Sequence, residues 1–555
     1  MTPTPHSVQA GLAAVDALLQ PFNRADSPGL IVGIAHEGRA IYRRGVGLAC
    51  IEQGVAMSPR TRVRIASTSK HFTSVAILLL AEEGKLDIDD LIYQHLPELP
   101  RLHPAGPTLR QLMQHTGGWR TDLAAVVNGL ALEPTADWSQ PLRTPHTALN
   151  FEPGSRMVYS NAGYQLLARV IERISGQAFG DFLKARIFAP LDLHDTESVT
   201  SDFEIRPGMA LQYQMQPDGS QRRGMYPGEL RGSGSLVSTI DDMLRWLAHL
   251  RSPVKTVGSA ASWAQMLTLP ALSTGMAMPY ALGLFRHPYR GVEVIHHAGA
   301  VLGATSQMIT VPSHALDIMI MANGAPVSTV ALGFQIIDAL LGDAQLGAPV
   351  EHLPSAGHDA LIGKRYHAAA TGALIGFDAV AGKLALSWFG GRPAPLRREG
   401  GDAVLASEDS ALNPVLIALD QLRIGEAAPA VLTISDGGHL LRCERLPDTP
   451  DVDAGELGQQ LAGRYRAPDL EADAHIELLG DLIVLQLQGR QGRNAYRLKP
   501  LSAQVMLAEA MDPMLGAIGG SGIVNVDREA GSVIGLRLDT TRLRQLRITR
   551  EKDAA

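Results

Sequence analysis

The length of the chain is the feature that most restricts how it can fold. The sequence has 555 residues, whereas single hydrophobic cores stop growing near about 250–300 residues and longer chains divide into domains. Apolar residues make up 45% of the chain and charged residues 19%, a normal balance for a globular protein and one that excludes wholesale disorder. We therefore expect two or three domains.

Charge and cysteine content limit the partners of the protein. The formal net charge is −7, and the 49 Lys and Arg residues form no basic run, so the sequence does not favour nucleic acid as a partner. The two cysteines, Cys50 and Cys443, lie far apart in the chain. We expect each to be a buried apolar residue without a disulfide, as is usual in a reducing compartment.

The sequence predicts a cytoplasmic protein that does not span a membrane. Residues 1–6 lack the basic region of an export signal, and residues 8–19 mix polar side chains with apolar ones. The longest strongly apolar stretch, residues 75–81, is far shorter than the roughly 18 residues of a membrane-spanning candidate.

Strand patterns lie at both ends of residues 1–345, and the region between them is mainly helical. The first two strand patterns flank Glu37-Gly38 and suit a hairpin. We predict that distant segments pair in one antiparallel sheet with helices packed on it, so that active-site residues come from several segments. The expected elements are strands 29–35, 40–43, 292–295, 307–311 and 316–320 and helices 15–22 and 330–341.

Two small β-barrels are expected after this domain. Residues 346–356 and 448–457 are predicted linkers, because prolines occur there without a helix or strand period. The segments 357–447 and 458–555 open alike, with Leu-Ile-Gly-Lys-Arg-Tyr and Leu-Ala-Gly-Arg-Tyr, which indicates an internal duplication. Each continues with short strand patterns and Gly-rich turns, as in small antiparallel barrels.

Ser67 and Lys70 lie at the start of an apolar helix pattern. Apolar residues recur with helical spacing from 72 to 80, which predicts a buried helix that begins near Ser67. The two side chains then project from one turn to the same side. A serine needs a nearby base to become a nucleophile, and lysine serves when its pKa falls below about 10.4. A capping serine and a solvated lysine are the alternative interpretation.

A second segment, Tyr159-Ser160-Asn161, precedes an amphipathic helix pattern over 162–174. Alternate residues of an extended segment share a face, so a phenol that relays protons and an amide that holds a carbonyl can enter one cleft. A core tyrosine and a helix-capping asparagine are the alternative.

A third segment, His297-Ala298-Gly299, follows a strand pattern. Glycine there permits close approach by a substrate backbone, and the histidine can donate to or orient a leaving group. A surface histidine on an edge strand is the alternative interpretation.

Together the three segments resemble the penicillin-recognising serine hydrolases, in which Ser-x-x-Lys is followed by Tyr-x-Asn and by Lys- or His-x-Gly on an edge strand. Residues 108–119 and 232–242 resemble other segments of that family. The resemblance implies a serine β-lactamase or penicillin-binding type of catalytic domain. It also implies site roles for Ser67 as nucleophile, Lys70, Tyr159, Asn161 and His297 as catalytic residues, Gly299 as substrate contact, and the Ser67 and Ala300 amides as oxyanion hole.

Whether Lys70 or Tyr159 is the acylation base stays open at this stage. No cofactor or metal is predicted, because the glycine-rich residues 516–522 lack the Lys-Ser/Thr of a phosphate loop. His296-His297 also has no Cys, His or Glu cluster near it in the sequence.

His297 and the barrels direct the prediction to one branch of the family. A mostly neutral histidine holds a substrate carboxylate less firmly than lysine, which disfavours D,D-peptidase and β-lactamase activity. The domain order resembles the bacterial D-aminopeptidase branch along the whole chain. This implies an aminopeptidase that releases amino-terminal D-residues such as D-alanine from peptides, amides and esters through an acyl-enzyme, with β-lactams as inhibitors.

In that branch a loop of the last barrel offers a carboxylate to the substrate ammonium group. Residues 508–518 are the matching loop, with Asp512 as candidate and Glu509 as competitor, although an aspartate that caps a turn is an ordinary alternative. Other functions left open are an esterase, a β-lactamase or D,D-peptidase, and a non-catalytic sensor acylated by β-lactams. A homodimer is compatible with the sequence.

Overall fold

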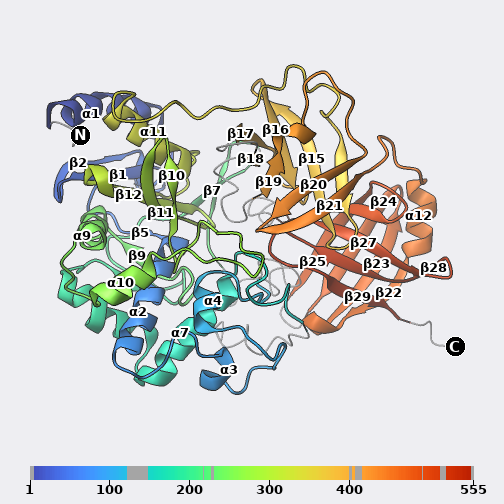
Figure 1. Cartoon of the computed structure of the whole chain (residues 1–555), viewed down its shortest axis with the longest axis horizontal. Helices are drawn as coiled ribbons and strands as arrows, with labels where there is room; N and C mark the ends of the chain where they lie inside the picture. Colours follow the sequence, from blue (N-terminus) through green and yellow to red (C-terminus); the bar gives the residue numbers. More distant parts are fainter. Residues whose placement is uncertain are drawn as a thin grey trace.

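The chain forms one mixed helix and sheet domain followed by two β-barrels (Figure 1). The computed structural model describes residues 5–121, 148–216, 218–226, 230–398, 403–406, 415–489, 492–512 and 520–551, and the statements below refer to these parts of the chain. This order of a catalytic-type domain and two barrels confirms the predicted fold class.

A six-stranded antiparallel sheet, in the order β10-β11-β12-β13-β1-β2, is the centre of the first domain. Leu30 of β1 lies opposite Ala322 of β13, so the two ends of the domain meet inside the sheet, as predicted. Glu37 and Gly38 form the hairpin turn with φ values of 53° and 77°. The strands are β1 (Leu30–His36), β2 (Arg39–Val46), β10 (Phe285–Tyr289), β11 (Val292–Val301), β12 (Ala304–Val311) and β13 (Leu316–Ala322).

Helices cover both faces of this sheet. One apolar core joins α1 and α11 to one face, and a second core joins the other face to α9 and to the helices around α2 and α7. At Gly33 of β1 an added Cβ would lie 2.1 Å from Ile240 Cγ2, so only glycine lets α9 approach this closely. The helices are α1 (Pro5–Leu19), α2 (Lys70–Glu82), α3 (Ile92–His95), α4 (Leu109–Met113), α7 (Asn161–Ser175), α8 (Phe179–Leu183), α9 (Ile240–Arg251), α10 (Ala260–Met266) and α11 (Thr329–Leu341).

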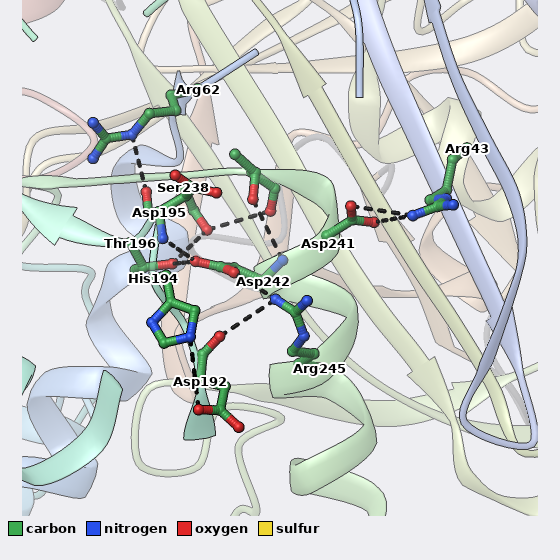
Figure 2. Close-up of polar contacts among 11 residues, drawn as sticks. Arg43, Arg62, Asp192, His194, Asp195, Thr196, Ser238, Asp241, Asp242 and Arg245 are labelled. Carbon is green, nitrogen blue, oxygen red and sulfur yellow. Dashed lines mark hydrogen bonds and ion pairs between the residues drawn. The ribbon is translucent and has the colours of Figure 1, made fainter. Parts of the chain in front are cut away.

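A buried carboxylate fixes the start of α9. Asp242 accepts hydrogen bonds from the backbone N–H of Asp195 and from the hydroxyl of Thr196, both at 2.8 Å (Figure 2). Thr239 caps the helix by accepting from the Asp242 N–H at 3.4 Å. Burial raises the pKa of the Asp242 carboxyl. These contacts fix the start of α9 against the segment that carries Asp195 and Thr196. The short strands are β3 (Leu48–Cys50), β4 (Val55–Ala56), β5 (Val63–Arg64), β6 (Glu197–Ser198), β7 (Tyr213–Met215), β8 (Gln221–Arg223) and β9 (Leu236–Ser238).

Each barrel is closed by eight antiparallel strands in chain order. The repeated segments noted in the sequence open the two barrels, and their tyrosines, Tyr366 and Tyr465, occupy equivalent buried places. The first barrel contains β14 (Arg365–Ala368), β15 (Ala373–Val380), β16 (Lys383–Trp388), β17 (Ala394–Arg398), β18 (Ala403–Ala406), β19 (Val415–Ala418), β20 (Val431–Asp436) and β21 (His439–Arg445). The second contains β22 (Gly463–Ala467), β23 (Ala472–Leu479), β24 (Leu482–Gln488), β25 (Arg493–Pro500), β26 (Val505–Ala510), β27 (Ser521–Glu529), β28 (Ser532–Asp539) and β29 (Leu546–Arg550).

The segment between the barrels is partly helical. Helix α12 (Ala454–Leu461) overlaps the predicted linker 448–457, because Asp453 caps it by accepting from the Glu456 N–H at 2.9 Å. Leu457 and Leu461, one turn apart, pack into the core of the second barrel. Pro447 and Pro450 therefore mark the connection between the two barrels, and α12 belongs to the second barrel.

Buried charges join the barrels to the first domain. Arg120 forms an ion pair with Asp469 of the second barrel, and both side chains are almost fully buried. Asp436 of the first barrel lies between Arg156 of the first domain, at 3.4 Å, and Arg544 of the second barrel, at 3.3 Å. One carboxylate therefore contacts all three domains.

Other features concern the cysteines and the membrane. Cys50 and Cys443 are free and buried, as expected, and burial raises the pKa of Cys443 to about 12. Among the described helices, none combines the length and the apolar character needed to cross a bilayer.

The ion pair of Arg120 provides a test of how the barrels dock. We expect Asp469→Asn to destabilise the protein by about 3–5 kcal/mol, because it leaves a buried guanidinium without its counter-ion. Asp473→Asn is the matched control, since its pair with Arg466 is exposed and such pairs contribute about 0–1 kcal/mol. Urea denaturation followed by tryptophan fluorescence measures both. Equal shifts in the two variants would contradict the predicted difference.

Buried histidines give stability a pH dependence. The pKa values of His71, His115 and His296 lie well below the usual range, and that of His297 falls to about 3, because burial disfavours the charged imidazole in all four. Below about pH 6.5 the unfolded chain takes up protons that the folded chain does not. We expect the free energy of unfolding to fall from pH 7 toward pH 5, by up to about 1.4 kcal/mol per pH unit for each histidine.

Carboxyl groups oppose this trend only in part. Asp539, whose pKa burial raises to about 6, stabilises the folded state as pH falls below that value. Urea midpoints measured between pH 7.5 and 5 give the net slope, which we expect to fall toward acid. His71→Phe should reduce the slope, whereas His194→Gln, at an exposed histidine, should leave it unchanged. Constant midpoints across this range would refute the prediction.

Candidate active site

Ser67 lies in a single 3₁₀ turn, Ala66–Ser69, between β5 and α2. It is the one residue from Val63 to Leu80 that is not buried. The residue before it, Ala66, is fully buried with φ of 48°, a left-handed conformation that costs a non-glycine residue about 1–2 kcal/mol. The Ser69 hydroxyl donates to the Ala66 carbonyl at 2.6 Å and helps to hold this turn. The helix start predicted at Ser67 is therefore a 3₁₀ turn, and α2 begins at Lys70.

Strands β11 and β12 form hydrogen bonds with the turn that carries Ser67 and with the residues before it. The Thr68 hydroxyl donates to the His297 carbonyl at 3.1 Å, and the Ser306 hydroxyl donates to the Ile65 carbonyl at 2.7 Å. An added Cβ at Gly299 would lie 2.1 Å from the Ile65 carbonyl oxygen. Glycine at 299 is therefore required by the packing of β11 against the turn that carries Ser67.

The triplet from His297 to Gly299 lies inside β11, where the sequence placed it at the end of a shorter strand. Pairing with β10 stops at His296, opposite Phe285. Residues 297–301 continue to pair with β12 alone, so this part of β11 is an open edge beside Ser67. The exposed Ala300 lies on that edge. The sequence resemblance assigns its backbone amide to the oxyanion hole.

The amine of Lys70 is fully buried and contacts three oxygens. It lies 3.0 Å from Ser67 Oγ, 2.9 Å from Asn161 Oδ1 and 2.7 Å from the Ser233 carbonyl. The carbonyl and amide oxygens can only accept, so each takes one N–H of the lysine. The third oxygen belongs to the Ser67 hydroxyl, which can accept a hydrogen bond from an ammonium or donate one to a neutral amine. This geometry suits a base that takes the Ser67 proton.

Tyr159 and Asn161 lie beside this amine. Ser160, and not Asn161, caps α7, since its hydroxyl accepts from the Gly163 N–H at 3.2 Å. The Asn161 side chain is thereby left to bind Lys70. The Tyr159 side chain is buried, with the Lys70 Nζ 4.7 Å from its ring centroid.

His115, which the sequence prediction did not assign a role, packs against Tyr159 with ring centroids 4.1 Å apart. It has φ of 58°, and its Nδ1 accepts from the Ser160 N–H at 3.1 Å. Burial, followed by the charge of Lys70, lowers its pKa well below the usual range, so the imidazole is neutral. Residues 108–119 resemble a segment of the same family. The structure shows that this segment supplies His115, which packs against Tyr159.

His297 is buried with both ring nitrogens engaged. Nδ1 lies 2.6 Å from the Ala298 carbonyl, and Nε2 lies 2.9 Å from the Tyr280 hydroxyl. A carbonyl can only accept, so Nδ1 carries the proton and the tyrosine donates to Nε2. Burial, followed by the charge of Lys70, lowers the pKa of His297 to about 3. The neutral ring thus contacts Tyr280 through one nitrogen and the backbone of β11 through the other.

The predicted ammonium-binding loop is only partly described. Asp512 is half-buried just after β26, while residues 513–519 lie outside the described residues. Its competitor, Glu509, forms an ion pair with Lys499 of the neighbouring strand at 2.8 Å, so its carboxylate already binds a cation.

Comparisons with known proteins agree with this geometry. A family model described as Beta-lactamase matches residues 15–341. A D-aminopeptidase of Cereibacter sphaeroides is 27% identical over 537 residues, 95% of this chain and 96% of that protein. A D-aminopeptidase of Gluconobacter oxydans is 26% identical over 537 residues, with the same coverage.

Among solved structures, the octameric penicillin-binding protein homologue from Pyrococcus abyssi covers 98% of this chain and 99% of its own, with a TM-score of 0.52 and 17% identity. At that identity the likeness supports the fold alone. The family model spans more than half of the sequence and includes the segments that carry Ser67, Lys70, Tyr159 and His297. This chain therefore belongs to the beta-lactamase family, within the penicillin-recognising serine hydrolases.

Proposed function

We propose that this protein is a serine aminopeptidase that releases amino-terminal D-residues from short peptides and amides. The observation that carries the proposal is the buried Lys70 amine 3.0 Å from the half-buried Ser67 hydroxyl. The D-aminopeptidases of Cereibacter sphaeroides and Gluconobacter oxydans support the substrate class, because their similarity extends over 95% of this chain and so includes both barrels.

In the proposed acylation step, Ser67 Oγ attacks the carbonyl carbon of the amino-terminal residue. A C–O bond forms as the hydroxyl proton passes to the Lys70 amine, and the backbone amides of Ser67 and Ala300 bind the oxyanion. The C–N bond then breaks, and the leaving amine takes a proton that returns through Tyr159. The product of this step is an ester of the D-residue with Ser67.

Deacylation reverses the proton path with water as nucleophile. Water adds to the ester carbonyl and gives its proton to the Lys70 and Tyr159 pair, and the C–O bond to Ser67 breaks as Oγ regains a proton. The free D-amino acid leaves. We assign Lys70 as the acylation base, because two obligate acceptors orient its third position toward Ser67.

The neutral His297 supports this reaction over β-lactam or D,D-peptide hydrolysis. An uncharged ring with both nitrogens engaged offers no charge to a substrate carboxylate. An aminopeptidase needs instead an anion for the substrate ammonium group, and we keep Asp512 as the candidate.

The nucleophile is tested with D-alanine p-nitroanilide. We expect Ser67→Ala to lower kcat at least about 1,000-fold, because no other hydroxyl can form the acyl-enzyme. Ser201→Ala, at a surface turn, is the control and should keep wild-type turnover. Mass spectrometry after rapid acid quench should find the acyl group on Ser67. A fully active Ser67→Ala variant would refute the mechanism.

Substrate class is tested by comparing D-alanine amide, L-alanine amide, a chromogenic cephalosporin and a short acyl ester. The proposal expects the D-amide to be hydrolysed with the highest kcat/KM. If the ester or the cephalosporin is hydrolysed with a higher kcat/KM than the D-amide, the proposal is refuted and the protein is an esterase or a β-lactamase instead.

The role of Asp512 is tested by blocking the substrate amine. We expect Asp512→Asn to raise KM for D-alanine p-nitroanilide about tenfold, because it removes a charge-assisted contact to the ammonium group. The N-acetylated substrate should show no such increase. Glu509→Gln is the control, since that carboxylate binds Lys499. Equal increases for the free and blocked substrates would remove Asp512 from the site.

A further inference from the structure

The turn between β28 and β29 of the second barrel reaches the ring of Tyr159. The guanidinium carbon of Arg542 lies 5.1 Å from the centroid of that ring, and Lys70 Nζ lies 4.7 Å from it. One phenol of the first domain thus has two cations over its ring, and one of them comes from the far end of the chain.

The turn is held at this place by the first domain. The Asn150 amide nitrogen donates to the Arg542 carbonyl at 2.8 Å, and its amide oxygen accepts from the Arg544 N–H at 2.9 Å. Within the turn, Thr540 Oγ1 accepts from the Leu543 N–H at 3.1 Å, and the Leu543 side chain is buried. The backbone that carries Arg542 is therefore fixed before any substrate binds.

Two buried arginines, Arg120 and Arg544, also anchor this turn. The Arg120 guanidinium donates to the carbonyls of Arg544 and Gln545 at 3.1 and 3.2 Å. The Arg544 guanidinium lies 3.3 Å from Asp436 of the first barrel. A turn that served only to close the barrel would not need these contacts with both other domains.

We propose that Arg542 is a positioning residue for Tyr159. Its guanidinium holds the phenol ring in place and favours the phenolate of Tyr159 and the neutral amine of Lys70. The inference rests on the proposed function. A cation within about 6 Å of a ring face attracts the ring. The same charge stabilises a phenolate relative to a phenol and a neutral amine relative to an ammonium, so it acts on Tyr159 and Lys70 in one direction.

Two described cations lie over the ring of Tyr159, beside several uncharged rings. Packed against it are Lys70 from α2, His115 from the loop after α4, Tyr164 from α7, Tyr280 before β10, His297 from β11 and Arg542. The two imidazoles are neutral, because burial lowers their pKa values. The charge of Arg542 is one of those that lower the pKa of His115, which agrees with its place beside the ring.

The test is the pH profile of kcat/KM for D-alanine p-nitroanilide in three variants. Removal of a nearby cation raises the pKa of an amine and of a phenol alike, so we expect Arg542→Gln to move the whole profile upward by about 0.5–1 pH unit and to lower kcat/KM at pH 7 about 3–10-fold. Arg542→Lys should restore the profile. Arg547→Gln, at an exposed arginine of β29, is the charge-matched control and should leave it unchanged.

A purely structural role would lower kcat without moving the profile, and would not be rescued by lysine. Either result overturns the inference. Labelling of Ser67 by a fluorophosphonate, measured as a rate constant against pH in the same variants, separates this inference from the proposed function. If D-alanine substrates are not hydrolysed, the proposed function fails, while an upward shift of the labelling profile in Arg542→Gln still supports Arg542 and an unshifted profile refutes it.

Discussion

The buried amine of Lys70 is the interaction on which the rest of the site depends. An amine without access to water must find acceptors, and it finds one in Asn161 and one in the Ser233 carbonyl. These two partners come from different segments, and together they direct the amine to Ser67. The same contacts therefore satisfy a buried amine and direct it to the Ser67 hydroxyl. Loss of any partner should disturb both, which links the stability of the domain to its chemistry.

The surrounding structure holds the turn of Ser67 and the phenol of Tyr159 beside this amine. Gly299 lets β11 lie against the Ile65 carbonyl, so the open strand edge and Ser67 form one unit. On the other side, the Met157 N–H donates to the Gly437 carbonyl of the first barrel at 2.9 Å, two residues before Tyr159. The first barrel thus helps to hold the segment that carries Tyr159.

The sequence predicted those parts of the site that depend on local spacing. Ser67 and Lys70 share a turn, so three residues of separation were enough to place one beside the other. The antiparallel sheet and the two barrels followed from periodicity and from a repeated segment. The length of β11, the engagement of His297 by Tyr280 and the place of Arg542 depend on contacts between distant segments, which no local pattern encodes.

The charges around Tyr159 also restrict how an aminopeptidase substrate can bind. Lys70 and Arg542 both lie over the ring, and the neighbouring imidazoles of His115 and His297 are neutral. The Arg542 guanidinium repels a substrate ammonium group from this side of the site, because like charges in a buried setting are costly. Such a substrate must place its amine away from the phenol and against an anion. An aminopeptidase built on this site therefore needs a carboxylate supplied from elsewhere in the chain, which is the physical reason to test a residue of the last barrel.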